Sequence, residues 1–332
     1  MEFWLRYDLR RPSFASACTA DLIDEALKQV EWADSLGFHT VQLSEHHGAP
    51  DGYNPSPLIL GAAVAARTKK LRINPPLIIT LHDPVRLAED CCILDQISRG
   101  RLDVTIAIGY VPHEFAMFGV PLEHRGQIAE EKLTVIKTIF SGKDFDYHGR
   151  CGRVTPAPYQ VGGPKIYVGG SVKASARRAA KFGDGFYPMN ASLFQEYRLA
   201  CERMGKPEGK TLLFSAPVFF HISEDPDAAW DKIAPHAMHE ANSYAAMAAI
   251  TGLVSPFPAA MTSDELRATG AYEVMTPDEC ISYCRAAHVE GHNLIFSPMM
   301  GGLSPDFAWE SLELFASQVL PALFDEGLVT TP

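Results

Sequence analysis

Three adjacent residues, Glu45-His46-His47, could take part in proton transfer or metal binding. They follow the short apolar run Val41–Leu43, so we expect them at the end of a strand. A histidine there could act as an acid or base near neutral pH. Adjacent strand residues point to opposite faces, so His46 and His47 are poorly placed to bind one metal ion. Spacing alone equally favours histidines held by hydrogen bonds.

A second stretch, Gly169-Gly170-Ser171, could bind an anion. It lies between the apolar run 165–168 and a helical pattern over 172–182. Backbone N–H groups at a helix start, with the hydroxyls of Ser171 and Ser175, are suited to holding a phosphate. A tight turn without a ligand is the alternative interpretation.

A third group, His236, His239 and Glu240, has a spacing that places its members on one helical face. No fourth ligand is indicated, so we interpret the group as a solvated face and predict no metal site. The sequence has no Gly-x-Ser-x-Gly motif, and no cysteine falls at a predicted strand end.

These candidates must be positioned by strands and helices that alternate along the chain. Short β-branched runs alternate with amphipathic helical patterns, which is typical of βαβ units with a parallel sheet. The fold class is therefore α/β, and eight strand candidates favour a closed (β/α)8 barrel over an open sheet. Polar and glycine-bearing strand ends should then converge on one face. The expected strands are 3–9, 41–47, 71–80, 102–109, 165–168, 185–188, 212–220 and 293–297.

Two segments depart from the repeat within what we predict to be a single domain over 1–332. Residues 142–160 are rich in Gly and Pro and indicate a hairpin-like insertion. Residues 221–275, after strand seven, are irregular, as expected of a lid or binding loop. Four residues of this region suggest an apolar substrate, although they could equally pack into the protein: Trp230, Met247, Phe257 and Met261.

Composition narrows the classes of protein. The chain has 332 residues, 47% of them hydrophobic, and a formal net charge of -11. Such a charge disfavours binding to nucleic acid or to an anionic membrane. Seven cysteines without metal or disulfide spacing suit a reducing compartment. With no signal-peptide pattern and no run of membrane-spanning length, we expect a cytoplasmic protein.

Several motifs together resemble the bacterial luciferase family of flavin-dependent oxidoreductases. The resemblance covers nearly the whole chain, and its motifs occur in the family's order. They are the runs 43–47, 82–90, 94–102 and 169–171, followed by Arg178-Ala179-Ala180.

The resemblance implies a (β/α)8 TIM barrel that binds a flavin at its C-terminal mouth. It places the flavin phosphate at Gly169, Gly170 and Ser171. It places the ring against Glu45, Ile79-Thr80 and Gly109-Tyr110, where the family often has a cis peptide bond between the residues equivalent to Ile79 and Thr80. His46 matches the histidine that assists oxygen chemistry in luciferases. Ile108 stands where luciferase has an arginine, so a phosphate contact from that strand is in question, and Arg125 or the helix start would have to compensate.

The predicted function is that of a flavin-dependent monooxygenase, which uses reduced FMN and oxygen to oxidise a small, apolar organic substrate. A separate flavin reductase would supply the reduced FMN, and dimers are common in the family. Two alternatives remain open. One is a hydride-transferring oxidoreductase of the same family with a deazaflavin coenzyme. The other is a non-catalytic flavin-binding accessory subunit.

Overall fold

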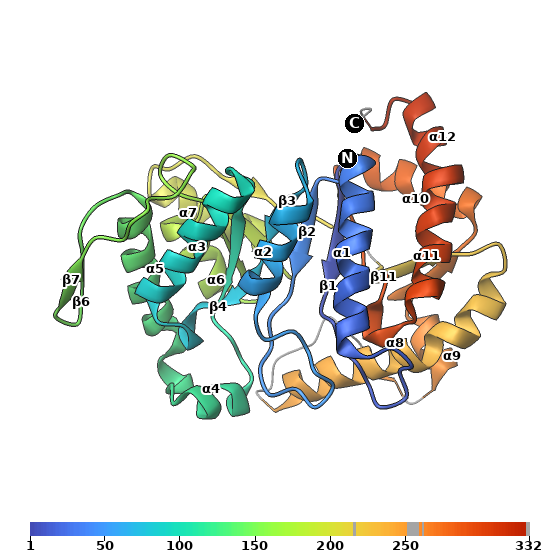
Figure 1. Cartoon of the computed structure of the whole chain (residues 1–332), viewed down its shortest axis with the longest axis horizontal. Helices are drawn as coiled ribbons and strands as arrows, with labels where there is room; N and C mark the ends of the chain where they lie inside the picture. The colour runs from blue at the N-terminus through green and yellow to red at the C-terminus, as the bar shows by residue number, and fades with distance from the viewer. Residues whose placement is uncertain (215–216, 251–258, 261, 330–332) are drawn as a thin grey trace. The chain divides into compact units, whose positions relative to one another are not determined.

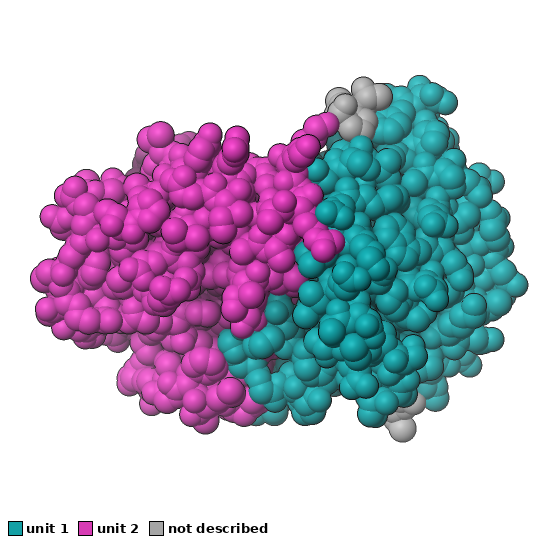
Figure 2. Space-filling view, in the orientation of Figure 1, with its two compact units in different colours: residues 1–42, 47–55, 213–332 teal, residues 43–46, 56–212 magenta. Residues whose placement is uncertain are grey.

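A computed structural model describes residues 1–214, 217–250, 259–260 and 262–329. The chain divides into two compact units, coloured separately in Figure 2. Unit 1 comprises residues 1–42, 47–55 and 213–332, and unit 2 comprises residues 43–46 and 56–212. None of the described helices has the length and apolar composition needed to cross a membrane.

Unit 1 is built around an aromatic core beneath parallel strands. Strand β1 pairs in parallel with β13, with Phe3 opposite Leu294, and β2 follows β1 in the sheet. The rings of Phe3, Phe38, Phe296 and Phe315 contact one another with centroids 4.8–6.2 Å apart. Aromatic burial of this kind is a large favourable term in folding. The elements of unit 1 at its two ends are β1 (Phe3–Tyr7), α1 (Thr19–Ser35), β2 (Thr40–Leu43), β13 (Leu294–Phe296), η3 (Met300–Gly302), α11 (Pro305–Leu314), η4 (Phe315–Val319) and α12 (Leu320–Asp325).

The rest of unit 1 contains a long helix and a second, two-stranded parallel sheet. Strand β11 pairs with β12 from Phe219–Tyr272 to Ile222–Met275. Helix α8 packs against this sheet and buries Trp230 in the same apolar cluster as Phe219 and Tyr272. The elements here, labelled in part in Figure 1, are β11 (Phe219–Ile222), α8 (Pro226–Ala249), α9 (Ser263–Ala268), β12 (Tyr272–Met275) and α10 (Pro277–Val289).

Unit 2 contains a five-stranded parallel sheet in the order β10-β9-β8-β5-β4. Its strands alternate with helices, as the sequence pattern predicts. The elements of unit 2 are α2 (Pro57–Arg67), β3 (Arg72–Asn74), β4 (Pro76–Ile78), η1 (Ile79–Leu81), α3 (Pro84–Ser98), β5 (Asp103–Ala107), α4 (Pro112–Phe118), η2 (Leu122–His124), α5 (Arg125–Phe140), β6 (Phe145–Tyr147), β7 (Arg150–Gly152), β8 (Lys165–Gly170), α6 (Lys173–Phe182), β9 (Gly185–Pro188), α7 (Leu193–Arg203) and β10 (Lys210–Thr211).

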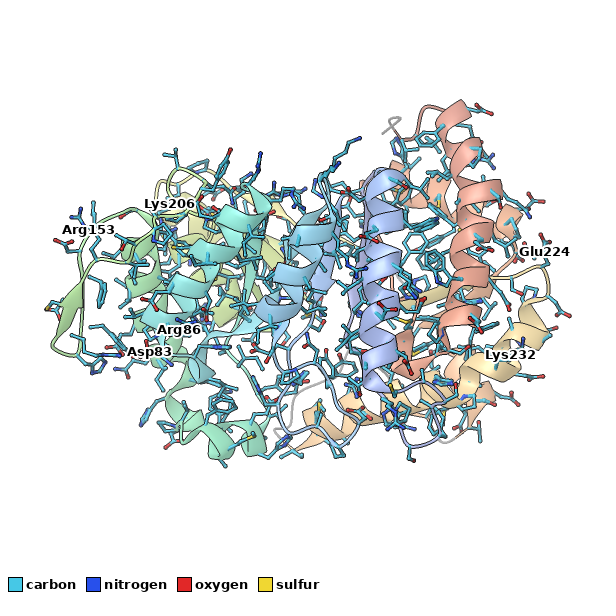
Figure 3. All side chains as sticks on the ribbon, in the orientation of Figure 1. Asp83, Arg86, Arg153, Lys206, Glu224 and Lys232 are labelled. Atoms are coloured by element: carbon cyan, nitrogen blue, oxygen red, sulfur yellow. The ribbon has the colours of Figure 1, made fainter. Side chains whose placement is uncertain are left out.

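Local sequence signals explain where many helices begin. Asp83 caps α3 by accepting hydrogen bonds from the N–H groups of Val85 and Arg86, and Pro84 takes the first helical position. Asp83 and Arg86 are labelled together at this helix start in Figure 3. At the start of α10, Thr276 and Glu279 form a capping box. The predicted hairpin in 142–160 is confirmed as antiparallel β6 and β7.

Three sequence-based predictions of strands are wrong in detail. The expected strand 71–80 breaks into β3 and β4 at Pro75, which has no N–H group to donate, and ends in the η1 turn. Of the expected strand 212–220, Phe219 and Phe220 begin strand β11, Phe214 forms an isolated parallel bridge with Asn293, and residues 215–216 lie outside the described residues. Residues 272–275, at the end of the region predicted to be irregular, form strand β12. Much of that region is the 24-residue helix α8.

Candidate functional site

The predicted site residues belong to unit 2, where four neighbouring strands end at one edge of the parallel sheet. The register pairs Ile78 with Ala107, and Gly170 with Pro188. Because β4, β5, β8 and β9 run parallel, their carboxyl ends lie side by side, and the loops that follow meet there. This is the position at which α/β folds bind their ligands.

The Glu45 carboxylate holds the turn that follows β4. Its side chain is fully buried, with one oxygen accepting from the Ile78 N–H and the other lying 2.8 Å from His82 Nε2. A buried carboxylate is costly unless hydrogen bonds satisfy it, and these two contacts provide them. Residues 78–82, which we call the η1 turn segment, are therefore fixed at both ends by one side chain.

Lys132 holds the same segment from helix α5. Its ammonium donates to the carbonyl oxygens of Thr80 at 2.7 Å and His82 at 2.6 Å. Burial lowers the pKa of Lys132, against the opposing charges of Asp83 and Glu131. Lys132 is only 8% exposed, so this charged side chain of helix α5 is buried where it contacts the turn.

Gly109 and Tyr110 follow β5 beside the η1 turn segment. The Thr80 hydroxyl donates to the carbonyl oxygen of Ile108 at 3.0 Å and so ties the segment to the end of β5. Gly109 has φ +73°, and a Cβ at this position would lie 2.8 Å from Ile78 Cγ2 and 2.9 Å from Phe115 Cε2. Glycine is therefore required both by the backbone conformation and by the close packing. Among the described residues the cis peptide bond is Thr155–Pro156, so the Ile79–Thr80 bond is not cis.

His46 is buried and forms a pair with Glu114 of helix α4. Its Nδ1 lies 2.8 Å from Glu114 Oε1, and the Tyr110 ring meets the imidazole edge-on with centroids 5.9 Å apart. Glu114 is 1% exposed. A carboxylate on one ring nitrogen fixes the orientation of the imidazole and directs the other nitrogen to a different partner.

Gly169 and Gly170 form the end of β8, and Ser171 leads to helix α6. Strand β8 includes both glycines, which therefore extend it beyond the predicted range 165–168. A Cβ on Gly170 would collide with the side chain of Ser175. The N-cap residue Val172 provides no side-chain hydrogen bond to the first turn of the helix. The N–H groups at this helix start are thus not capped by that side chain.

Arg178, one and a half turns into α6, is a buried cation with incomplete pairing. It is 6% exposed, its Nε has no hydrogen-bond partner among the described residues, and Glu130 lies 3.7 Å away. Burial lowers the pKa of Arg178, as does the nearby charge of Arg125, while Glu130 opposes the shift. A buried guanidinium in this state favours an additional anionic partner.

Unit 2 thus contains all nine predicted residues, and several functional candidates that sequence reasoning missed. Glu114 and Lys132 lie on helices far along the chain, and their spacing carries no signal for these contacts. His82 follows the predicted third strand, and its place among the polar strand ends is the signal in the sequence for it, although the contact with Glu45 is not predictable from spacing.

The interpretation of His236, His239 and Glu240 as a solvated face is wrong. Glu240 is fully buried in unit 1, where Tyr272 donates to it at 2.8 Å and Arg6 lies 3.3 Å away. Burial raises the pKa of Glu240, against the charge of Arg6. His236 Nδ1 lies 2.7 Å from the carbonyl oxygen of Gly301, and His239 Nε2 lies 2.7 Å from Asp51 Oδ2. The three side chains thus have separate protein partners.

The family model of luciferase-like monooxygenases matches residues 10–288 of this sequence. The chain belongs to the luciferase-like monooxygenase family. The motifs of the sequence had indicated this family, and the match confirms it.

Curated relatives and solved structures agree with this assignment. The alkanal monooxygenase beta chain of Photorhabdus laumondii subsp. laumondii is 32% identical over 159 residues, which cover 46% of this chain and 49% of the relative. The match therefore spans about half the length of that relative. The oxygenating constituent of 3,6-diketocamphane monooxygenase from the CAM plasmid of Pseudomonas putida, solved in complex with FMN, has a TM-score of 0.73 and 19% identity, with 100% of this chain and 99% of that chain covered.

A third similar structure is an F420-dependent secondary alcohol dehydrogenase in complex with an F420-acetone adduct. Its TM-score is 0.67 at 16% identity, and the match covers 92% of this chain and 97% of that chain. At these identities the structural matches establish the fold alone. The prediction of a (β/α)8 barrel is confirmed by them.

The packing around Gly109 predicts that its replacement by alanine is more harmful than a similar change elsewhere. Gly109→Ala should lower the free energy of unfolding by about 3 kcal/mol, because backbone strain adds to the collision with Ile78 and Phe115. Gly119 has φ +66°, but no atom lies within 4 Å of the position that a Cβ would take, so Gly119→Ala should cost only about 1 kcal/mol. Urea unfolding of both variants measures the difference, and equal losses would contradict the account.

Proposed function

We propose that the chain is the oxygenase of a two-component flavin-dependent monooxygenase. It would use reduced FMN from a separate flavin reductase, together with oxygen, to oxidise a small, apolar organic substrate. The observation that carries the proposal is the single sheet edge at which β4, β5 and β8 end, with the His46–Glu114 pair beside Tyr110 at the end of β5.

The start of α6 fits the phosphate of a flavin. Gly169, Gly170 and Ser171 would hold the phosphate by backbone N–H groups and the Ser171 hydroxyl. The N-cap residue of α6, Val172, forms no side-chain hydrogen bond with the first turn of the helix. Arg178, a buried cation whose Nε has no hydrogen-bond partner among the described residues, contributes positive charge on the same helix. We propose that this positive charge compensates for the arginine that luciferase has at the position of Ile108.

The η1 turn segment is the surface that we assign to the flat ring of the cofactor. Glu45 and Lys132 fix the backbone there, and Gly109 allows Ile78 and Phe115 to pack against the end of β5. Ile79, Thr80 and Tyr110 would then contact the ring, with Glu45 behind it. When bound, reduced flavin supplies the two electrons that activate oxygen.

His46 is assigned the proton-handling role. Glu114 binds Nδ1 and so fixes the orientation of the imidazole, which would move a proton at the reacting group. Burial of His46, Glu114 and Glu45 excludes water around these groups, which strengthens their electrostatic interactions and limits side reactions.

Substrate choice would rest with the segment 221–275, which we propose to act as a lid. Trp230 packs in the core of unit 1, so it is not available to a substrate, whereas Met247 is half-buried on α8. Phe257 and Met261 lie outside the described residues. The proposal of an apolar substrate therefore rests on the sequence alone.

A hydride-transferring reaction with a deazaflavin coenzyme is the second candidate. Ile108 in place of arginine favours it, since the phosphate of FMN then has one cation fewer at the end of β5. Its structural support is the similarity of fold to the F420-dependent dehydrogenase, which at 16% identity concerns the fold alone.

A non-catalytic flavin-binding subunit is the third candidate. The buried His46–Glu114 pair argues against it, because a binding subunit needs no group placed to move a proton.

A homodimer is the assembly that the surface of unit 2 suggests. Helices α2 and α3 pack against each other and expose three large aliphatic side chains, Ile59 at 75%, Ile93 at 47% and Ile97 at 44%. Ile93 and Ile97 are four residues apart and so lie on one face of α3. Such a patch is typical of an interface between protein chains.

Thermal unfolding with different cofactors decides between the first two candidates. Reduced FMN, added without oxygen at about a hundred times its dissociation constant, should stabilise the protein by about 2.7 kcal/mol and raise its melting temperature by several degrees. Riboflavin lacks the phosphate and should stabilise it less. Stabilisation by F420 and none by FMN would replace the monooxygenase with the hydride-transferring enzyme.

Replacement of His46 tests its role in turnover. His46→Ala should lower turnover of small aldehydes or ketones about a hundredfold or more, because general acid–base catalysis is lost. Flavin affinity should stay nearly constant, because the substitution removes no contact with the flavin ring. His124→Ala, at an exposed histidine, serves as the matched control. Unchanged turnover in His46→Ala would remove its catalytic role, and absence of turnover in the unmodified protein with its flavin bound would favour the accessory subunit.

The aliphatic patch on α2 and α3 predicts the effect of a charge. Ile93→Asp should convert a dimer to a monomer, since burial of an unpaired carboxylate in an apolar interface is unfavourable. Val289→Asp places the same charge at an 85% exposed position on α10 and should leave the mass unchanged. Sedimentation equilibrium distinguishes these outcomes, and a dimer that persists in Ile93→Asp would exclude this face as the interface.

A further inference from the structure

Lys132 is a buried charged residue to which the sequence assigns no function. It lies on α5, outside the strand ends that form the candidate site. Its ammonium donates to two carbonyl oxygens of the η1 turn segment, those of Thr80 and His82. Burying a lysine is costly, and an apolar residue would pack at this position without that cost. The structure thus places a positive charge beneath this one turn at an energetic cost.

The two hydrogen bonds determine which way the backbone of the turn faces. In a trans peptide group the C=O and N–H bonds point in opposite directions. Since Lys132 draws the oxygens of Thr80 and His82 toward α5, the N–H groups of Leu81 and Asp83 are directed away from α5. Glu45 fixes the same segment at the Ile78 N–H and the His82 ring. Neither peptide group can reverse without leaving the Lys132 ammonium with fewer partners.

We propose that Lys132 is a positioning residue that makes the η1 turn segment selective for the reduced, anionic form of the flavin ring. The inference rests on the proposed function, in which the ring lies against this segment. Carbonyl oxygens facing the ring would repel its negative charge. Lys132 turns two of them away and offsets their partial charge. Oxidised flavin has a neutral ring and depends less on this arrangement.

The selectivity has a functional meaning for an oxygenase that receives its flavin from a separate reductase. Such a protein must take up reduced flavin and release oxidised flavin after each turnover. A charge that favours the reduced ring achieves both with one side chain. Lys132 thereby acts on cofactor exchange, whereas His46 acts on the reacting groups.

Three variants separate the charge from the hydrogen bonds. Lys132→Met removes both, Lys132→Gln keeps a hydrogen-bond donor without the charge, and Lys132→Arg keeps both. Lys137→Met is the matched control, because Lys137 also lies on α5 and donates to a backbone carbonyl, that of Phe182 at 2.8 Å. The dissociation constants of reduced FMN, measured without oxygen, and of oxidised FMN are compared for each protein.

Lys132→Met should weaken binding of reduced FMN about tenfold more than binding of oxidised FMN. The ratio of the two dissociation constants for Lys132→Gln should lie between the ratios for Lys132→Met and the unmodified protein. Lys132→Arg should restore the original ratio, and Lys137→Met should leave it unchanged. Equal weakening of both redox forms would mean that Lys132 serves only the stability of the fold and would overturn the proposal. If Lys132→Met does not fold, the ratios for Lys132→Gln and Lys132→Arg decide.

Hydrogen exchange in the ligand-free protein provides a second measurement. The amides of residues 79–83 should exchange faster in Lys132→Met than in Lys137→Met, because the segment loses its contact with α5. Unchanged exchange there would show that Lys132 does not hold the turn. Failure of the unmodified protein to bind either form of FMN would instead reject the proposed function, so the two failures are distinguishable.

Discussion

A buried carboxylate that must be satisfied is the constraint on which the candidate site depends. Glu45 lies just after the end of β2 with its side chain fully buried, and it accepts hydrogen bonds from Ile78 and His82. These partners belong to the turn after β4, which Thr80 connects in turn to the end of β5. Because an unsatisfied buried charge costs several kcal/mol, these strand ends are held together. This edge, at which Gly109 follows β5 and Gly169-Gly170 end β8, is where we propose that a planar cofactor binds.

Buried charges serve a different purpose in unit 1. Arg10 is fully buried between the rings of Tyr53 and Tyr244, 4.6 and 4.5 Å from its guanidinium carbon, and forms an ion pair with Asp51 at 2.8 Å. Burial opposes ionisation of Asp51, but hydrogen bonds from His239 and Arg10 lower its pKa to about 2. Tyr244 and His239 both lie on α8, so the network fixes this helix to the loop before α2. The half of the chain that carries the proposed lid is thereby anchored by charge rather than by apolar packing alone.

Periodicity predicted most of the fold, because alternating strands and amphipathic helices are encoded locally. Capping residues such as Asp83 and Thr276 are local signals of the same kind, because each accepts a hydrogen bond from the first turn of the helix that follows it. The errors arose where tertiary contacts decide. Pairing with Phe219–Ile222 makes residues 272–275 a strand, and burial against Arg6 and Tyr272 makes Glu240 internal. Glu114 and Lys132 were missed because they meet their partners across 68 and 52 residues of sequence. Motifs pointed to the strand ends of the candidate site, whereas the side chains that hold these strand ends in place depend on contacts between residues distant in the sequence.

We propose that a flavin lies along one sheet edge of unit 2, with its phosphate at the start of α6 and its ring on the η1 turn segment. A crystal structure of the protein with reduced FMN, grown and cooled without oxygen, tests this most directly. The account predicts phosphate density within hydrogen-bond distance of Ser171 and ring density in contact with Thr80 and Gly109. Ring density at any other surface, or a phosphate remote from α6, would contradict it.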